Sequence, residues 1–288
     1  MNTNKYLDTL KEYKLEVDSF KVAETVQDII DLEFKSNNNK EVYKTIYSCI
    51  DLTTLKSTDT KESIWKFIED VNDFDGSTDM ENVAAICIYP NFVEVAEEAL
   101  TAENVKIACV TGGFPSSQTF PEIKVAETAL AVANGANEID IVLNLGLFLD
   151  EAYEELCEEI DEIKESCREA KLKVILETGA IKSLTKIKIA SILSMYSGAD
   201  FIKTSTGKTY EGATLEAAYV MCSSIKEYYE KTGRKIGFKA SGGISDTKTA
   251  VEYYTIVKSV LGEEWCNKDL FRIGASTLTK NLLKDIQK

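Results

Sequence analysis

A short apolar run followed by an amphipathic helical pattern recurs along most of the chain. The apolar runs predict strands, and the residues between them place apolar side chains at the three- and four-residue spacing of a helix. Eight such units, about 22–37 residues apart, indicate a parallel (β/α)8 barrel of the TIM type, an α/β fold. A doubly wound open sheet is the main alternative. The predicted strands are Tyr47–Leu52, Val83–Ile88, Val105–Thr111, Glu138–Leu143, Lys173–Thr178, Phe201–Ser205, Ile236–Ser241 and Phe271–Gly274.

The first 45 residues precede this repeat and have a helical pattern of their own. Apolar residues at helical spacing predict a helix over residues 4–35, a loop over 36–40 and a short helix over 41–46. We therefore expect residues 1–45 to form a helical extension that covers one end of the barrel or makes a subunit contact. No linker rich in Pro, Gly or Ser divides the remainder, so residues 46–288 are expected to form a single TIM-barrel catalytic domain.

Composition narrows the classes of protein that the chain can represent. No apolar run approaches the ~20 residues of a membrane span, and the start lacks the pattern of a secretory signal. Seven cysteines occur singly, which fits reduced thiols in a cytoplasm. The net charge of −15 argues against a nucleic-acid partner, because phosphate backbones require basic surfaces.

The chain has no histidine, which restricts its chemistry further. Catalytic triads, metal sites and acid–base steps that depend on imidazole are excluded. Proton transfer must therefore use Lys, Asp, Glu, Tyr, Cys or water. No cluster of metal ligands is apparent in the sequence, so neither a metal nor a cofactor is expected.

Two lysines lie inside apolar strands, Lys203 after Phe201-Ile202 and Lys239 after Gly237-Phe238. Burial of an ammonium group is costly unless its pKa falls or a partner compensates for its charge. A bland alternative is a strand-end lysine that reaches out to water. Two lysines in the same setting on neighbouring strands favour a chemical role.

The alternation of side chains along strands places these lysines inside the barrel with two carboxylates, Asp140 and Asp51. A partly desolvated lysine beside a second cation has a lowered pKa, and its neutral amine can form a Schiff base with a carbonyl. Asp140 could relay protons directly or through water. The alternative is a structural ion pair that fills a layer of the barrel, with Asp51 or Glu177 balancing the charge.

Glycine-rich loops predict where an anion binds. Barrels often hold phosphate with the loops after strands seven and eight. Ser241-Gly-Gly243 and Gly274-Ala-Ser276 occupy those positions, and Gly207-Lys208 follows strand six. The sequence therefore predicts a phosphate site beside Lys203.

The same residues resemble the motif series of a known family, the deoxyribose-phosphate aldolases. The order and spacing are similar from about residue 45 to 283. The pair Lys203-Thr-Ser-Thr-Gly207 and Lys239-Ala-Ser-Gly-Gly243 is highly specific. The other matching motifs are Asp51-Leu-Thr-Thr-Leu55, Cys87-Ile-Tyr-Pro90, Val110-Thr-Gly-Gly-Phe-Pro115, Glu138-Ile-Asp-Ile-Val142 and Arg272-Ile-Gly-Ala-Ser276.

The resemblance implies a metal-free class I aldolase. It would cleave 2-deoxy-D-ribose 5-phosphate reversibly to D-glyceraldehyde 3-phosphate and acetaldehyde. Lys203 resembles the Schiff-base lysine, Lys239 the lysine that lowers its pKa, and Asp140 the acid–base residue. A homodimer is the expectation for the family. Asp51 and Thr53 resemble substrate-hydroxyl and proton-relay residues, Cys87 a cysteine near the site or a packing thiol, and Gly207, Lys208, Gly242, Gly243, Gly274 and Ser276 phosphate contacts.

Two departures from the family and two rival functions accompany this expectation. The first ~45 residues exceed those of short members, and the chain ends in Lys284-Asp-Ile-Gln-Lys288 without the C-terminal tyrosine that some members use in proton transfer. One rival is a Schiff-base barrel enzyme that acts on a different phosphorylated sugar. The other is a sugar-phosphate-binding barrel that has lost catalysis.

Overall fold

A computed structural model describes residues 5–288 of the chain. Within that range, eight parallel strands follow one another in sequence order around a closed barrel. Because β1 pairs with β8 as well as with β2, the sheet has no edge, and the open-sheet alternative is excluded. The TIM-barrel prediction is confirmed. The strands are β1 (Ile50–Thr53), β2 (Ala85–Ile88), β3 (Lys106–Val110), β4 (Glu138–Val142), β5 (Lys171–Ile175), β6 (Phe201–Lys203), β7 (Gly237–Ser241) and β8 (Phe271–Ala275).

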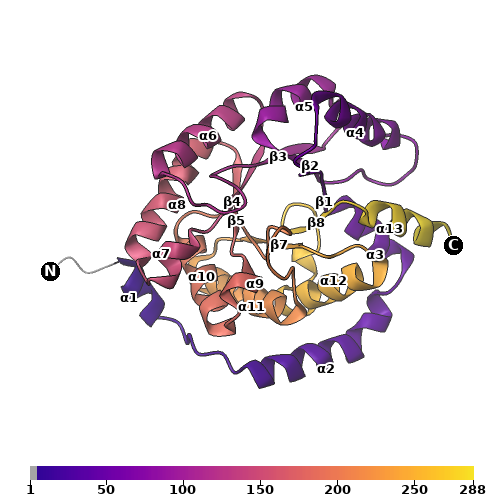
Figure 1. Cartoon of the computed structure of the whole chain (residues 1–288). Coiled ribbons are helices and arrows are strands. Elements are labelled where there is room, and N and C mark those ends of the chain that lie inside the picture. The colour runs from indigo at the N-terminus through magenta and orange to yellow at the C-terminus, as the bar shows by residue number, and fades with distance from the viewer. Residues whose placement is uncertain (1–4) are drawn as a thin grey trace.

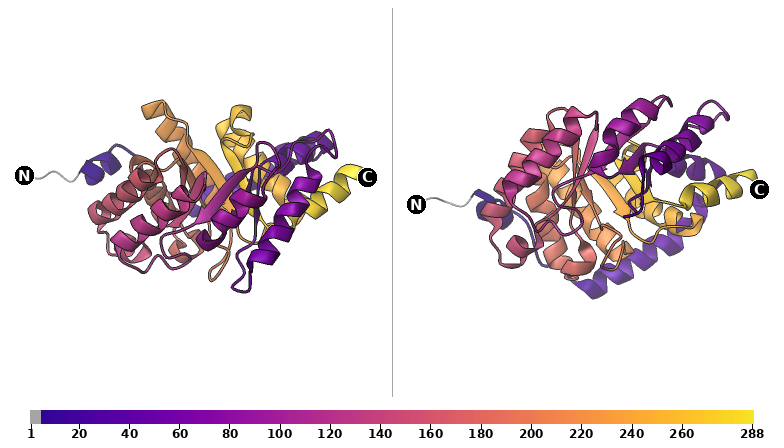
Figure 2. Two further views of the ribbon diagram at one scale, coloured as in Figure 1. Left: turned by 90° about the horizontal axis from the view of Figure 1, so that it is seen from above. Right: turned by 45° about the horizontal axis from the view of Figure 1, so that its top comes forward.

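A ring of helices surrounds the strands, as Figure 1 shows along the barrel and Figure 2 from two further directions. The main hydrophobic core lies between the strands and this ring. The barrel helices are α4 (Lys61–Phe74), α5 (Val93–Ala99), α6 (Pro121–Ala133), α7 (Leu145–Leu149), α8 (Tyr153–Cys167), α9 (Thr178–Ile181), α10 (Leu184–Tyr196), α11 (Leu215–Thr232), α12 (Thr247–Leu261) and α13 (Leu278–Gln287), with short 3-10 turns at Pro90–Phe92 and Glu263–Trp265.

Most strand boundaries differ from those predicted by one or two residues, and two differ by three. The first strand was predicted from Tyr47, but Tyr47 belongs to the helix α3 (Lys40–Ser48), and β1 begins at Ile50. Tyr47 is buried in either case, so its apolar character does not distinguish a helix face from a strand. The fifth strand was predicted to end at Thr178, which instead begins α9.

The predicted continuous helix over residues 4–35 was wrong. Its residue 4 lies outside the described range, and the remainder divides into α1 (Lys5–Lys11) and α2 (Ser19–Asn37). The break occurs because the Asp18 carboxylate accepts the backbone N–H groups of Phe20 and Lys21 and so caps a new helix. The backbone N–H of Val17 donates to the hydroxyl of Thr185, which ties the irregular segment to α10.

The N-terminal helices lie against the side of the helical ring. Helix α2 packs on α11 and α12, and α1 packs on α8 and α10; Figure 1 shows α2 running along the outside of the ring. The predicted loop over 36–40 shrinks to two residues between α2 and α3. The division into an extension and a catalytic domain stays a prediction. Among residues 5–288, no helix combines the length and apolar character that would let it cross a membrane.

Candidate active site

The inner face of the barrel carries a layer of charged side chains. Strand register places Lys203 opposite Lys239, and Lys239 opposite Arg272. On the other side, Asp140 is opposite Lys173. Because side chains alternate along each strand, the apolar neighbours of these residues face the helices, and the charges face inward. The bulk of the apolar core is therefore kept apart from the charges.

The structure brings the predicted lysines and carboxylates into direct contact. The Nζ of Lys203 donates to Oδ2 of Asp140 at 2.7 Å, and the Nζ of Lys239 donates to the same oxygen at 2.8 Å. Lys239 also donates to Asp51. The expectation that Asp51 could help to balance the lysines agrees with this geometry. Glu177 instead accepts hydrogen bonds from Thr206.

Three further charges complete this group and were not assigned roles from the sequence. The Nζ of Lys173 lies 2.6 Å from Glu138, 2.9 Å from Asp140 and 3.5 Å from Asp51. Arg272 donates to both oxygens of Glu138, at 2.7 and 3.0 Å, and also to Asp51. We call the whole set the charged cluster: Asp51, Glu138, Asp140, Lys173, Lys203, Lys239 and Arg272.

Lys203 differs electrostatically from the two other lysines of the charged cluster. Burial lowers the pKa of the Lys203 ammonium, and Lys239 lowers it further, which together outweigh the opposing effect of Asp140. Burial also disfavours the charged forms of Lys239 and Lys173. For these two, however, the surrounding carboxylates outweigh burial and raise the pKa. The neutral amine is thus most accessible on Lys203.

The carboxylates of the charged cluster stay ionised. Burial alone would raise the pKa of Asp140, but Lys173, Lys203 and Lys239 outweigh it and hold that pKa well below its ordinary value. For Asp51, Lys239 and Arg272 lead the cations that outweigh burial in the same way. Asp140 is therefore an ionised hydrogen-bond acceptor shared by Lys203 and Lys239.

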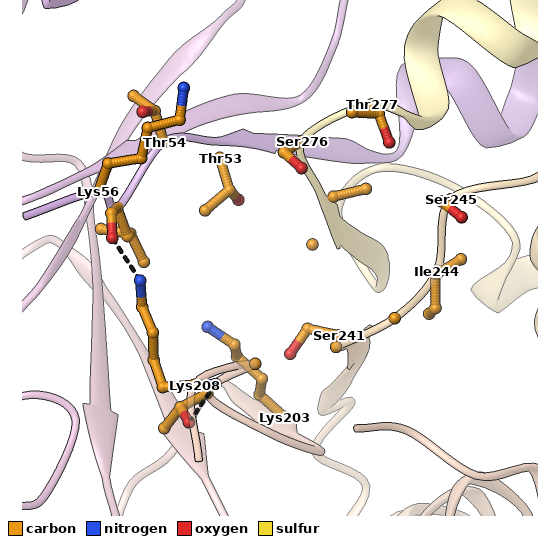
Figure 3. A pocket seen from close by; sticks show the side chains of 17 residues that line it. Thr53, Thr54, Lys56, Lys203, Lys208, Ser241, Ile244, Ser245, Ser276 and Thr277 are labelled. Atoms are coloured by element: carbon orange, nitrogen blue, oxygen red, sulfur yellow. Dashed lines mark hydrogen bonds between the residues drawn. The ribbon is translucent and has the colours of Figure 1, made fainter. Parts of the chain in front are cut away.

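A pocket of about 360 Å3 opens above the charged cluster. Its lining comes from segments at the carboxyl ends of β1, β6, β7 and β8, where barrel active sites lie. The lining includes three lysines and no carboxylate, although the chain has a net charge of −15. Figure 3 shows the Nζ of Lys203 directed into the space between Thr53, Lys208 and Ser241.

All residues predicted to contact phosphate line this pocket, as does Thr53. Lys208 reaches across the mouth and donates to the backbone carbonyl of Leu55 (Figure 3). Gly242 has a φ of +94°, and a Cβ there would lie 2.7 Å from the Cα of Gly212, so a larger residue would displace the loop. The residues predicted to contact phosphate are Gly207, Lys208, Gly242, Gly243, Gly274 and Ser276.

Four other predicted residues lie beneath the pocket. They are buried and absent from the pocket lining: Asp51, Cys87, Asp140 and Lys239. Asp51 and Asp140 contact the lysines instead, and Cys87 belongs to a small apolar cluster inside the barrel that includes Ala85 and Val110. Burial raises the pKa of the Cys87 thiol. This environment favours the packing role for Cys87.

The family model for DeoC/LacD family aldolases matches residues 45–264. The chain belongs to this family. The human deoxyribose-phosphate aldolase is 42% identical over 248 residues, which cover 82% of this chain and 78% of the human protein. The bovine deoxyribose-phosphate aldolase is 41% identical, over 83% of this chain and 79% of its own length. The protein is thus an aldolase, a carbon–carbon lyase.

Solved structures of aldolases resemble the chain as well. The structure of QR15, an aldolase, has a TM-score of 0.69 and 33% sequence identity, covering 84% of this chain and 96% of QR15. Deoxyribose phosphate aldolase from Aeropyrum pernix, described as a tetramer, has a TM-score of 0.69 and 25% identity, covering 91% of this chain and 98% of its own. The barrel of our aldolase is therefore shared with known aldolases.

Proposed function

We propose that the aldolase cleaves 2-deoxy-D-ribose 5-phosphate reversibly to D-glyceraldehyde 3-phosphate and acetaldehyde, through a Schiff base on Lys203. One observation carries the proposal. Among residues 5–288, Lys203 is the single member of the charged cluster that also lines the pocket. Its lowered pKa makes its amine a nucleophile nearer neutral pH than an ordinary lysine.

The reaction begins with the neutral amine of Lys203 attacking the C1 aldehyde of the open-chain sugar. Loss of water from the resulting carbinolamine leaves a protonated imine. A base then removes the proton of the C3 hydroxyl, the C2–C3 bond breaks, and its electron pair moves into an enamine. D-glyceraldehyde 3-phosphate leaves at this point. Protonation of the enamine at C2 and hydrolysis of the imine release acetaldehyde and restore the amine.

Asp140 is the residue best placed to move the protons. Its Oδ2 lies 2.7 Å from the Nζ of Lys203, and its carboxylate is ionised. Because Asp140 does not line the pocket, a water molecule must carry the proton between it and the substrate. Lys239 shares the same carboxylate oxygen and so keeps a second positive charge close to Lys203.

The phosphate group of the substrate explains the remaining lining. Backbone amides at Gly207, Gly242, Gly243 and Gly274 and the side chains of Lys208 and Ser276 offer hydrogen-bond donors on one side of the pocket. The absence of carboxylates from the described lining removes charge repulsion. A sugar phosphate bound there would place its reactive end toward Lys203.

Borohydride trapping tests the proposal. Reduction in the presence of 2-deoxy-D-ribose 5-phosphate is expected to add mass to the peptide that contains Lys203, and Lys203→Met should abolish the adduct. Labelling at Lys239 or Lys208 instead would overturn the assignment. A barrel that binds the sugar phosphate without any adduct would be a binding protein. In the addition direction, acetaldehyde as the preferred donor distinguishes this activity from a Schiff-base enzyme for another sugar.

A homodimer in the cytoplasm is our expectation for the assembly and location. The family resemblance supports the dimer, and the single cysteines support a reducing compartment, since all seven are free and buried. A mass measurement by light scattering distinguishes a dimer from a monomer or from a tetramer.

A further inference from the structure

Glu177 is a buried carboxylate at the edge of the pocket whose partners are neutral. It lies two residues beyond the end of β5, and the residue is 3% exposed. Its Oε2 accepts the hydroxyl of Thr206 at 2.6 Å, and its Oε1 accepts the backbone N–H of the same residue at 3.1 Å. No lysine or arginine within residues 5–288 lies at salt-bridge distance from it. The buried carboxylate of Glu177 therefore has both of its hydrogen bonds with one residue of the pocket, Thr206.

Thr206 connects Glu177 to Lys208, in the segment predicted to contact phosphate. Its hydroxyl oxygen accepts the backbone N–H of Lys208 at 3.2 Å. Thr206, Gly207 and Lys208 all line the pocket, whereas Glu177 does not. Glu177 therefore acts on this segment from outside the pocket: Thr206 donates two hydrogen bonds to its carboxylate, and the backbone N–H of Lys208 donates one to Thr206.

The turn around Glu177 is held in an unfavourable backbone conformation. Glu177 has φ and ψ of 54° and 59°, in the left-handed region that residues with a Cβ rarely adopt. Two residues on, Gly179 packs so closely on the chain after β6 that a Cβ would lie 2.3 Å from the carbonyl oxygen of Glu211. The backbone N–H of Thr178 donates to Thr204 at 2.9 Å. The turn after β5 thus contacts both ends of the segment 204–211, through Thr178 at residue 204 and through Gly179 at residue 211.

We propose that Glu177 is a positioning residue that fixes the Thr206–Lys208 segment in the shape that binds the phosphate of the substrate. This inference rests on the proposed function, because it assigns a determinant of phosphate recognition within the same pocket. Removal of the carboxylate would leave the buried N–H of Thr206 without an acceptor and release the segment. Phosphate affinity should then fall, while the Lys203 amine, anchored by Asp140, should keep its reactivity.

The test compares Glu177→Ala with the unmodified enzyme on 2-deoxy-D-ribose 5-phosphate and on 2-deoxy-D-ribose. An unsatisfied buried donor predicts a rise in KM for the phosphorylated sugar of about tenfold or more. The kcat/KM for the unphosphorylated sugar should change little, and inorganic phosphate should inhibit more weakly. Glu177→Gln retains one acceptor oxygen, so its changes in KM and in inhibition by phosphate should be smaller. This variant replaces Glu177→Ala in the test if the alanine variant does not fold.

Glu159→Gln is the matched control. Glu159 is also a buried carboxylate, bound by Lys124 at 2.7 Å and Asn144 at 3.3 Å, but none of these three lines the pocket. The Glu159→Gln variant should be less stable than the unmodified enzyme, but its preference for the phosphorylated sugar should be unchanged. Equal losses on both sugars in the Glu177 variants, or no change in KM, would overturn the proposal.

Trapping with acetaldehyde and borohydride distinguishes a failure of the role proposed for Glu177 from a failure of the proposed function. Acetaldehyde carries no phosphate, so adduct formation at Lys203 should be the same in the Glu177 variants and in the unmodified enzyme. If the unmodified enzyme forms no adduct, the proposed function fails. Binding of inorganic phosphate, measured by calorimetry, still decides the role of Glu177 in that case, and unaltered binding in Glu177→Ala would refute it.

Discussion

Replacement of Lys239 by methionine should move the pH dependence of the reaction. Lys239 and Lys203 each donate to Oδ2 of Asp140, at 2.8 and 2.7 Å. Their two nitrogens therefore lie within about 5 Å of each other, where two like charges repel by about 3 kcal/mol at an effective dielectric constant of about 20. Together with burial, this repulsion lowers the pKa of Lys203.

The sign of the effect follows from the form of Lys203 that reacts. In the proposed mechanism only the neutral amine attacks the aldehyde, so kcat/KM should rise with pH through the pKa of Lys203 in the free enzyme. Without the charge of Lys239 that pKa is higher, and Asp140 and Asp51 lose a competing cation, which raises it further. The acid limb of kcat/KM should therefore shift to higher pH, and borohydride trapping should show the same shift.

Lys124→Met provides the control for loss of a buried lysine. Lys124 pairs with Glu159 at 2.7 Å and is as buried as Lys239, but it lies outside the charged cluster. This variant should be less stable and should keep the original pH profile. An unchanged profile in Lys239→Met would refute the electrostatic reasoning, whatever the absolute rate.

Three further outcomes are expected. Incubation with EDTA should leave activity unchanged, because the carboxylates of the charged cluster already pair with lysine and arginine and no group of metal ligands is found among residues 5–288; strong loss would indicate a metal-dependent aldolase. Gly242→Ala should raise KM for the phosphorylated sugar and cost about 1–3 kcal/mol of stability, measured by steady-state kinetics and denaturant unfolding. Cys87→Ala should cost about 1 kcal/mol and retain the Lys203 adduct by mass spectrometry, whereas loss of the adduct would show that the thiol has a chemical role.

The barrel could be predicted from the sequence because its signal is local and repeated. Each strand and its following helix show their own periodicity, and eight repeats outweigh an error in any one boundary. Errors in element boundaries arose where a residue would be buried in either a helix or a strand. Tyr47 packs into the core from α3 as it would from a strand. The break after α1 depends on one capping side chain, Asp18, in a segment whose apolar spacing continues on both sides.

The charged cluster could be predicted only in part. Alternation along single strands placed Lys203, Lys239, Asp140 and Asp51 on inward faces, and they do meet. The partnership of Lys173 with Asp140 depends on the register between β4 and β5, which the sequence of neither strand specifies. Arg272 follows Phe271 in an apolar strand, much as Lys203 follows Ile202. The same burial argument applied to this residue would have indicated an inward cation.

The charge balance of the full charged cluster favours the proposed reactive amine on Lys203 over a purely structural ion pair. Its four cations face three carboxylates, so one positive charge is in excess when every group is ionised. Lys173 contacts three carboxylates, and Lys239 and Arg272 contact two each, whereas Lys203 contacts Asp140 alone. The excess is removed at least cost where the partners are fewest. Three cations thus form the structural layer, and their balance with the carboxylates favours a neutral amine on Lys203, at the pocket.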